Sequence, residues 1–227
     1  FTPEMPRDFT VGRLTPVEEF SRRVKTTMVG LGFQEMIFNY LGSGADYVES
    51  MYDEADWEDA FAQTVRIANP MSENYEYVRP SVLPSLLGAE AVSGNAAYPH
   101  HIFEVGNVAR RDDTDVTGTV TRTVLGFLSA DGEAGFNLVN SHISAILFYM
   151  AREYTLREAR DSRFIPGRAA EIVAPAGKKR TAPAVFGVFG EVHPRVLETW
   201  GIQVPCTAGE IDLERLLEHR AGGTSKR

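Results

Sequence analysis

Two adjacent arginines stand where an alternating polar and apolar stretch ends. The residues "HIFEVGNVARRDDTD" (101–115) read as a strand that finishes at Arg110 and Arg111, and "VTGTVTRTVLGF" reads as a strand that returns. A strand, a polar loop and a return strand can hold a phosphate or a nucleotide, with the arginines as its donors. The same pattern is typical of any exposed hairpin, so these residues alone leave both interpretations open.

Three carboxylates follow one another at a spacing of two near the end of the chain. Glu210, Asp212 and Glu214 would share one face if they all lay on a single strand, and they would then repel a triphosphate. We therefore expect the strand to end near Asp212 and Arg215 to lie on a terminal helix.

Two charged residues lie within otherwise apolar stretches. Arg168 occurs in "PGRAAEI" and Glu191 in "GVFGEV", where an unpaired buried charge would cost several kcal/mol. We predict that the two form an ion pair across neighbouring strands. Gly187 and Gly190 could suggest a phosphate loop, but they are more typical of an inner strand that packs closely.

The residue types that bind transition metals are few and scattered. The single cysteine, Cys206, excludes an internal disulfide and a cysteine-based metal site, and we expect it to be buried and inert. His100, His101 and His142 do not supply a set of four ligands. We predict no metal site, and we expect His193 to cap a helix or to lie at the surface before Pro194.

The composition limits the class of protein. The chain has 227 residues, of which 43% are hydrophobic and 24% charged, with a net charge of −8. Strong binding to nucleic acid phosphates is disfavoured, because the chain has no basic run beyond "GKKR" (177–180) and its last residues. No stretch approaches the roughly 18 apolar residues of a membrane helix, and the first residues do not resemble a signal peptide. We expect a cytoplasmic protein without a membrane partner and, because it does not begin with Met, a piece of a longer chain.

The N-terminal third begins with a clear helix signal. Thr15 and Glu18 have the spacing of a capping box, and Pro16 suits the first helical position. Apolar residues then recur at spacings of three and four up to Leu31. The stretch "QEMIFNYLG" (34–42) that follows is predicted to be one strand.

The remaining pattern mixes helices with mostly antiparallel strands and has no βαβ rhythm. We therefore predict an α+β fold with one antiparallel sheet flanked by helices. It would form a single module over residues 1–220, followed by a disordered tail at 221–227. The expected elements begin with a short helix within an acidic surface insertion at 45–63 and include a short strand that ends at Val78. The other expected strands are 64–69, 101–109, 119–130, 155–161, 166–175 and 183–192, the other helices are 81–91, 137–154 and 193–202, and a last strand and helix lie within 206–219.

Five collinear stretches carry a resemblance that covers most of the chain. They are "LTPVEEFSRRVKTTMVGLGFQEMIFNYLGS", "ANPMSENYEYVRPSVLPSLL", "AAYPHHIFEVGNVA", "IPGRAAEI" and "GVFGEVHPRVLETWGI". Together they resemble the C-terminal, class II synthetase-like core module of the β subunit of phenylalanyl-tRNA synthetase, of the archaeal or eukaryotic type.

The resemblance implies a division of labour between two subunits. In that family the α subunit performs the ATP- and magnesium-dependent attachment of phenylalanine to tRNA(Phe), and the β subunit carries a copy of the fold that has lost its active site. The copy packs on the α subunit through the first class II motif, here residues 15–41, within a heterotetramer. The implied interface residues are Phe20, Arg23, Phe33, Phe38 and Tyr40, and tRNA would be met indirectly through the complex.

The resemblance also implies that no residue of this chain is catalytic. Arg110 and Arg111 occupy the position of the second class II motif and are the candidates for contact with a cofactor. The third motif lacks its glycine-rich strand near 206–219. We expect the cavity of the ancestral enzyme to have lost the cations that grip a triphosphate, and the chain itself to bind no cofactor.

Two other interpretations stay open. The chain could be a stand-alone nucleotide-binding or activating paralogue that uses Arg110, Arg111 and the nearby carboxylates. An isolated fragment could also pair with itself through the first motif, since class II folds usually dimerise there.

Overall fold

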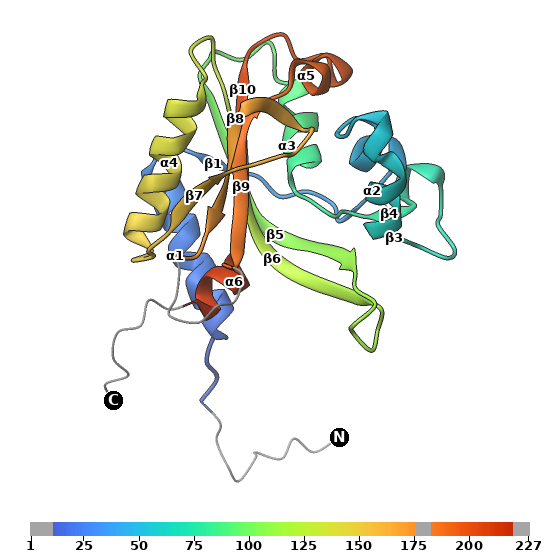
Figure 1. Ribbon diagram of the computed structural model, residues 1–227, viewed down its shortest axis with the longest axis horizontal. Coiled ribbons are helices and arrows are strands. Elements are labelled where there is room, and N and C mark those ends of the chain that lie inside the picture. The colour runs from blue at the N-terminus through green and yellow to red at the C-terminus, as the bar shows by residue number, and fades with distance from the viewer. Residues whose placement is uncertain (1–10, 176–182, 220–227) are drawn as a thin grey trace, which may run out of the picture.

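A seven-stranded sheet forms the centre of the computed structural model, which describes residues 11–175 and 183–219. Only its first two strands pair in parallel, so the predicted mostly antiparallel α+β fold is confirmed (Figure 1). The predicted basic turn at 177–180 and tail at 221–227 lie outside the described residues. In their spatial order the strands are β1 (Gln34–Glu35), β5 (His100–Arg111), β6 (Thr119–Ala130), β10 (Cys206–Asp212), β9 (Val185–Val192), β8 (Phe164–Val173) and β7 (Thr155–Glu158).

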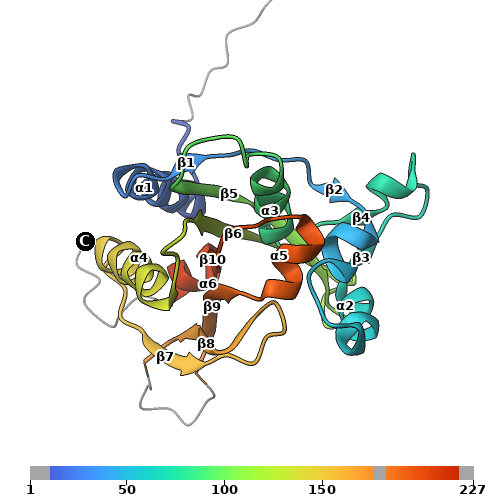
Figure 2. The ribbon, with the colours of Figure 1, turned by 90° about the horizontal axis from the view of Figure 1, so that it is seen from above.

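Helices cover both faces of this sheet. α1 (Pro16–Gly30) and α4 (Phe136–Tyr149) lie on one face, and α3 (Leu83–Ala91) and α5 (Pro194–Trp200) lie on the other (Figure 2). Alternate residues of β6 point to opposite faces, so Phe127 joins the core under α1 and α4, whereas Leu128 joins the core under α3 and α5. The short α6 (Leu213–Glu218) follows β10 directly and packs against the core under α1 and α4.

The predicted start of α1 is confirmed. Thr15 is the N-cap, and its side chain accepts a hydrogen bond from the Glu18 backbone N–H at 3.2 Å. The predicted apolar stripe is also present, with Val24 and Met28 fully buried against the sheet. None of the helices in the part of the chain that the structure describes is long and apolar enough to span a lipid bilayer.

The predicted continuous strand at 34–42 is wrong. The segment forms β1 and, after residues 36–40, a second short strand, β2 (Leu41–Gly42). The chain leaves the large sheet after the Met36 N–H bonds to the Phe103 carbonyl, and it enters a separate three-stranded sheet. The apolar run therefore links two sheets instead of filling one, and we call residues 36–40 the linker.

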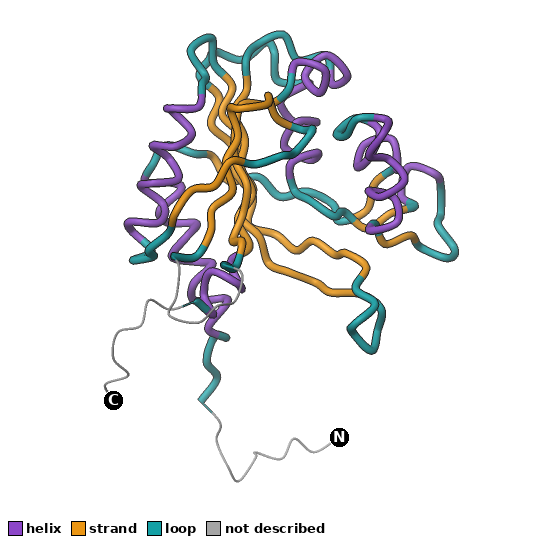
Figure 3. Tube along the Cα trace, viewed as in Figure 1, coloured by secondary structure: helices purple, strands orange, loops and turns teal. Residues whose placement is uncertain are grey.

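The acidic insertion packs beside the body as several short pieces, and one of them is a short α-helix, as predicted. η1 (Ala45–Glu49) is a π-helical turn, η2 (Glu54–Asp56) is a 3₁₀ turn, and α2 (Trp57–Gln63) is a short α-helix. The small sheet beside them is drawn as short strands joined by long loops in Figure 3. Its order is β2, β4 (Tyr77–Val78) and β3 (Val65–Arg66), and the 3₁₀ turn η3 (Glu73–Tyr75) precedes β4.

Candidate functional site

The predicted hairpin that carries Arg110 and Arg111 is present, and it is long. β5 and β6 pair from His100 to Arg111 in an unbroken antiparallel register. At the tip, the Asp112 and Asp115 carboxylates accept hydrogen bonds from Thr114 and Thr117, which hold the pKa of both carboxyl groups below the ordinary value. The aspartates therefore build the turn and do not act as partners for the two arginines.

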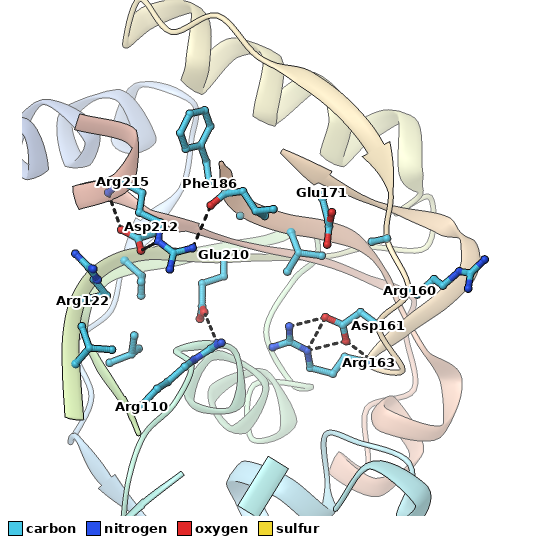
Figure 4. A pocket seen from close by; sticks show the side chains of 17 residues that line it. Arg110, Arg122, Arg160, Asp161, Arg163, Glu171, Phe186, Glu210, Asp212 and Arg215 are labelled. Carbon is cyan, nitrogen blue, oxygen red and sulfur yellow. Dashed lines mark hydrogen bonds and ion pairs between the residues drawn. The ribbon is translucent and has the colours of Figure 1, made fainter. Parts of the chain in front are cut away.

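The structure separates the two arginines. Arg110 lines a cavity of about 280 Å³ on the face of the sheet that carries α3, whereas Arg111 is exposed and lies outside its lining. β5, β6, β9, β10 and the segment before β8 form the walls (Figure 4). Charged residues dominate the lining: the arginines are Arg110, Arg122, Arg160, Arg163 and Arg215, and the acids are Asp161, Glu171, Glu210 and Asp212.

The expectation that this cavity lacks cations is wrong, but carboxylates occupy several of them. Arg122 lies 3.2 Å from Glu214, and Arg215 lies 3.3 Å from Asp212. The second pair joins residues three apart, since Asp212 is also the N-cap of α6. Carboxylates of β10 and α6 therefore neutralise these two guanidinium groups.

Arg110 is held more loosely by its carboxylate neighbour. Its Nε donates to the Pro80 carbonyl at 3.2 Å, and its Nη2 lies 3.9 Å from Glu210. The Glu210 carboxylate is itself fixed, because it accepts hydrogen bonds of 2.7 Å from both the Ser81 hydroxyl and the Val82 N–H. This carboxylate thus anchors the loop before α3 to the middle of the sheet.

The three carboxylates at spacing two do not share one strand face. β10 ends at Asp212, as predicted, and Glu214 and Arg215 lie on α6. Burial raises the pKa of Asp212, and hydrogen bonding and charge from Arg215 oppose that rise. Glu214 turns instead to β6, where it accepts from the Thr123 N–H at 2.8 Å.

A further pair at the cavity wall, Asp161 and Arg163, was not anticipated. Arg163 donates from Nε at 2.9 Å and from Nη2 at 2.6 Å to the two oxygens of Asp161. Although burial alone would raise the pKa of Asp161, the Arg163 guanidinium holds it below the ordinary value. The only signal in the sequence is a charged cluster, "REARDSR", directly before an apolar strand.

The predicted interface residues fall into two groups. Phe20 and Phe33 are 4% and 3% exposed and belong to the chain's own core, so their side chains offer no surface to a partner. Arg23 is exposed on α1, where it donates to the Tyr149 carbonyl at 3.5 Å. Phe38 is half-buried in the linker, and Tyr40 is 50% exposed there. The linker, and not the buried side of α1, carries the accessible part of the predicted interface.

The predicted polar pair is present. The Arg168 Nη1 lies 2.7 Å from the Glu191 Oε2, and the other oxygen of Glu191 accepts from the Phe136 N–H at the start of α4. Of the two roles expected for His193, the structure shows the cap of α5, because its Nδ1 accepts from the Arg195 backbone N–H at 3.1 Å. The pair therefore ties β8 and β9 to the beginning of α4.

No set of three or more histidine, cysteine, aspartate and glutamate side chains in residues 11–175 and 183–219 could hold a metal ion. Cys206 is buried, and burial raises the pKa of its thiol to about 12. His101 and His142 are less scattered than the sequence suggests, since their rings lie 5.6 Å apart and both pack on Phe33. Burial lowers the pKa of both imidazoles, which makes them neutral core residues.

Comparison with known proteins identifies the family. A model of the phenylalanyl tRNA synthetase beta chain CLM domain matches residues 2–213. The phenylalanine–tRNA ligase beta subunits of Borrelia hermsii and Borrelia turicatae are 46% and 47% identical to this chain over 217 residues. The beta subunit of Treponema pallidum is 43% identical over a stretch of the same length.

These matches cover 96% of this chain but only 36% of each Borrelia subunit and 34% of the Treponema subunit. The chain thus spans about a third of the length of the curated relatives it matches. The resemblance read from the five motif stretches is confirmed, and the chain belongs to the family of phenylalanyl-tRNA synthetase beta-chain CLM domains.

Proposed function

We propose that this chain is a non-catalytic docking module of a phenylalanine–tRNA ligase in the cytoplasm. It packs against a catalytic α subunit, which binds ATP and magnesium and attaches phenylalanine to tRNA(Phe). The relatives are named as beta subunits of this ligase, which supports such a partner. The net charge of −8 favours an indirect role towards tRNA, through the complex as a whole.

The observation that carries the non-catalytic role is the presence of carboxylates beside most of the cavity's arginines. Arg122 and Arg215 are bound to carboxylates at 3.2 and 3.3 Å, and Arg110 faces Glu210. A triphosphate carries several negative charges and needs unengaged cations at its phosphates. In this cavity it would have to displace carboxylates that belong to the walls.

The linker is the surface that suits a partner best. Ile37 is 85% exposed and Tyr40 is 50% exposed, and both follow the edge strand β1, which among the described strands pairs only with β5. An unpaired sheet edge beside exposed apolar side chains is a typical site for association. The neighbouring groove of about 550 Å³, to which Phe38 and Trp200 contribute, extends this surface.

Pyrophosphate exchange tests the non-catalytic role. The purified chain, without an α subunit, is incubated with phenylalanine, ATP and magnesium, and we expect no exchange of labelled pyrophosphate into ATP. Titration calorimetry with ATP–Mg should likewise show no saturable binding. Robust exchange by the pure chain would contradict the proposal and favour the stand-alone activating paralogue.

A substitution in the linker tests the docking surface. Ile37→Glu places a charge in the proposed interface, and we expect it to weaken binding to the α subunit by about tenfold or more. Val116→Glu is the matched control, because Val116 is fully exposed at the tip of the β5–β6 hairpin, outside the linker. Circular dichroism should show that both variants fold. Equal affinities would move the interface away from the linker.

The open edge of β1 also favours a second candidate, in which two copies of the chain pair in the absence of an α subunit. Light scattering of the pure chain should then report twice the mass of the monomer. The Ile37→Glu variant should restore the monomer if the same surface serves both associations.

A further inference from the structure

Two cavities meet at one group of charged residues. The cavity of about 280 Å³ on the sheet face and a second one of about 350 Å³ beside the insertion share Arg110, Arg160, Asp161 and Arg163 in their linings. Three guanidinium groups and one carboxylate therefore stand at the junction. Both oxygens of Asp161 accept hydrogen bonds from Arg163, so the net charge of these four residues is positive.

Arg163 has hydrogen-bonding capacity that the protein does not use. Its side chain is 8% exposed, and Nε and Nη2 donate to Asp161, but Nη1 has no hydrogen-bond partner among the described residues. Figure 4 shows its guanidinium directed from Asp161 towards the space below Glu210 and beside Arg110. A buried donor of a charged group that lacks a partner is costly, and an acceptor in this space would relieve that cost.

Two other cations border the same space. Arg110 uses Nε on the Pro80 carbonyl, and its Nη2 is at 3.9 Å from Glu210, which is beyond hydrogen-bonding distance. Arg160 makes no hydrogen bond or ion pair with any residue that the structure describes. Its guanidinium points away from Asp161 in Figure 4, so it does not face the same space. Arg110 and Arg163 are thus the groups that could hold an acceptor between them.

The neighbouring acids limit the charge of that acceptor. Glu210 borders the first cavity, and Asp56 and Asp59 border the second. A triphosphate would meet all of these carboxylates. A single oxyanion group between Arg110 and Arg163 would lie beside Glu210, which faces Arg110 at 3.9 Å, but it would bring less negative charge to that carboxylate.

We propose that the junction between the two cavities binds one oxyanion group of a small ligand, a carboxylate or a phosphate monoester. Arg163 Nη1 is the buried donor and Arg110 closes the opposite side. The site is separate from the linker, and it requires neither the α subunit nor catalysis by this chain.

Titration calorimetry with inorganic phosphate and, separately, with acetate tests this site. We expect saturable binding of at least one anion with a Kd of about 10 mM or tighter at low ionic strength. Binding of phosphate alone would identify a phosphoryl ligand, and binding of acetate would identify a carboxylate ligand. Arg110→Ala and Arg163→Lys should each weaken the binding about tenfold, the loss expected for a charge-assisted hydrogen bond.

Arg111→Ala is the matched control. Arg111 is adjacent to Arg110 on the same strand but lines neither cavity, so its removal should leave anion binding unchanged. If Arg163→Lys does not fold, the half-exposed Arg110 still decides the test. Equal losses in Arg110→Ala and Arg111→Ala would show attraction by general charge, and they would overturn the site, as would the absence of saturable binding to the wild-type protein. Neither result bears on the docking proposal, which depends on the linker.

Discussion

Two buried arginines of this chain are each paired with a carboxylate, but they differ in what they leave unused. Arg79 is fully buried and donates from Nη1 and Nη2 to Glu104 at 2.9 and 2.8 Å, and from Nε to the Asn107 carbonyl at 2.9 Å. Arg163 makes a similar pair with Asp161 but leaves Nη1 without a partner among the described residues. Burial of a charge therefore does not by itself mark a binding site, and the anion site proposed at Arg163 depends on its unused donor beside a cavity.

The largest effect should come from breaking the satisfied pair. Glu104→Ala leaves the Arg79 charge buried without a carboxylate, and the free energy of unfolding should fall by about 3–5 kcal/mol. Urea denaturation followed by fluorescence measures this change. Glu104→Gln should lose less, because an amide still accepts one hydrogen bond. A loss below about 1 kcal/mol in Glu104→Ala would mean that water reaches Arg79. The contrast between a fully satisfied Arg79 and an Arg163 with an unused donor would then fail.

A glycine beside this pair offers a steric test. A Cβ at Gly106 would lie 2.2 Å from the Arg79 Nη2 and 2.6 Å from the Glu104 Oε1, so Gly106→Ala must push the two side chains apart. We expect a loss of about 2–3 kcal/mol in the free energy of unfolding. Gly132→Ala is the control, because a Cβ there has no heavy atom within 4 Å. Equal stability of the two variants would contradict a tightly fixed pair.

The second pair should contribute less and should depend on pH. Asp161→Asn weakens the partner of a buried guanidinium, and we expect a loss of about 1–2 kcal/mol near neutral pH. The pKa of Asp161 is lower in the folded chain than in the unfolded chain, so its stabilisation is present above the unfolded value of about 3.9 and is lost as the pH falls through the folded value. The stability difference between wild type and variant should therefore shrink below about pH 4. A constant difference would assign the effect to packing.

An exposed pair gives the lower limit of the comparison. The Arg168 side chain is 60% exposed, so Arg168→Ala should change the free energy of unfolding by less than about 1 kcal/mol. Glu191 keeps its bond to the Phe136 N–H in this variant. A shift in the melting temperature as large as that of Asp161→Asn would show that exposure does not rank these pairs.

Local patterns in the sequence predicted the parts of the fold that local physics decides. The cap at Thr15, the end of β10 at Asp212 and the cap at His193 depend on residues within a few positions, and all three are present. The break of the stretch 34–42 into β1, linker and β2 could not be predicted in this way. It depends on where the Phe103 carbonyl and the strands of the small sheet lie, which only the tertiary structure determines.

The candidate cavity was predictable only in outline. The hairpin motif indicated Arg110, but the neutralising contact between Arg122 and Glu214 joins residues 92 positions apart. Similarly, Ser81 and Glu210 are 129 positions apart in the sequence. A sequence shows that charges are present, but not which of them meet. For this reason the loss of cations was a wrong expectation, and the non-catalytic proposal depends instead on the carboxylates that lie beside Arg122 and Arg215.

Tyr40 connects the linker to the buried Arg79. The Arg79 guanidinium lies 4.7 Å from the centre of the Tyr40 ring. The backbone N–H of Arg79 also donates a hydrogen bond to the Tyr40 carbonyl at 2.9 Å. The end of the linker is therefore fixed to the interior of the protein in the absence of a partner. A segment that is already rigid loses little conformational entropy on association, so a partner would meet a preformed surface and could bind by simple rigid-body contact.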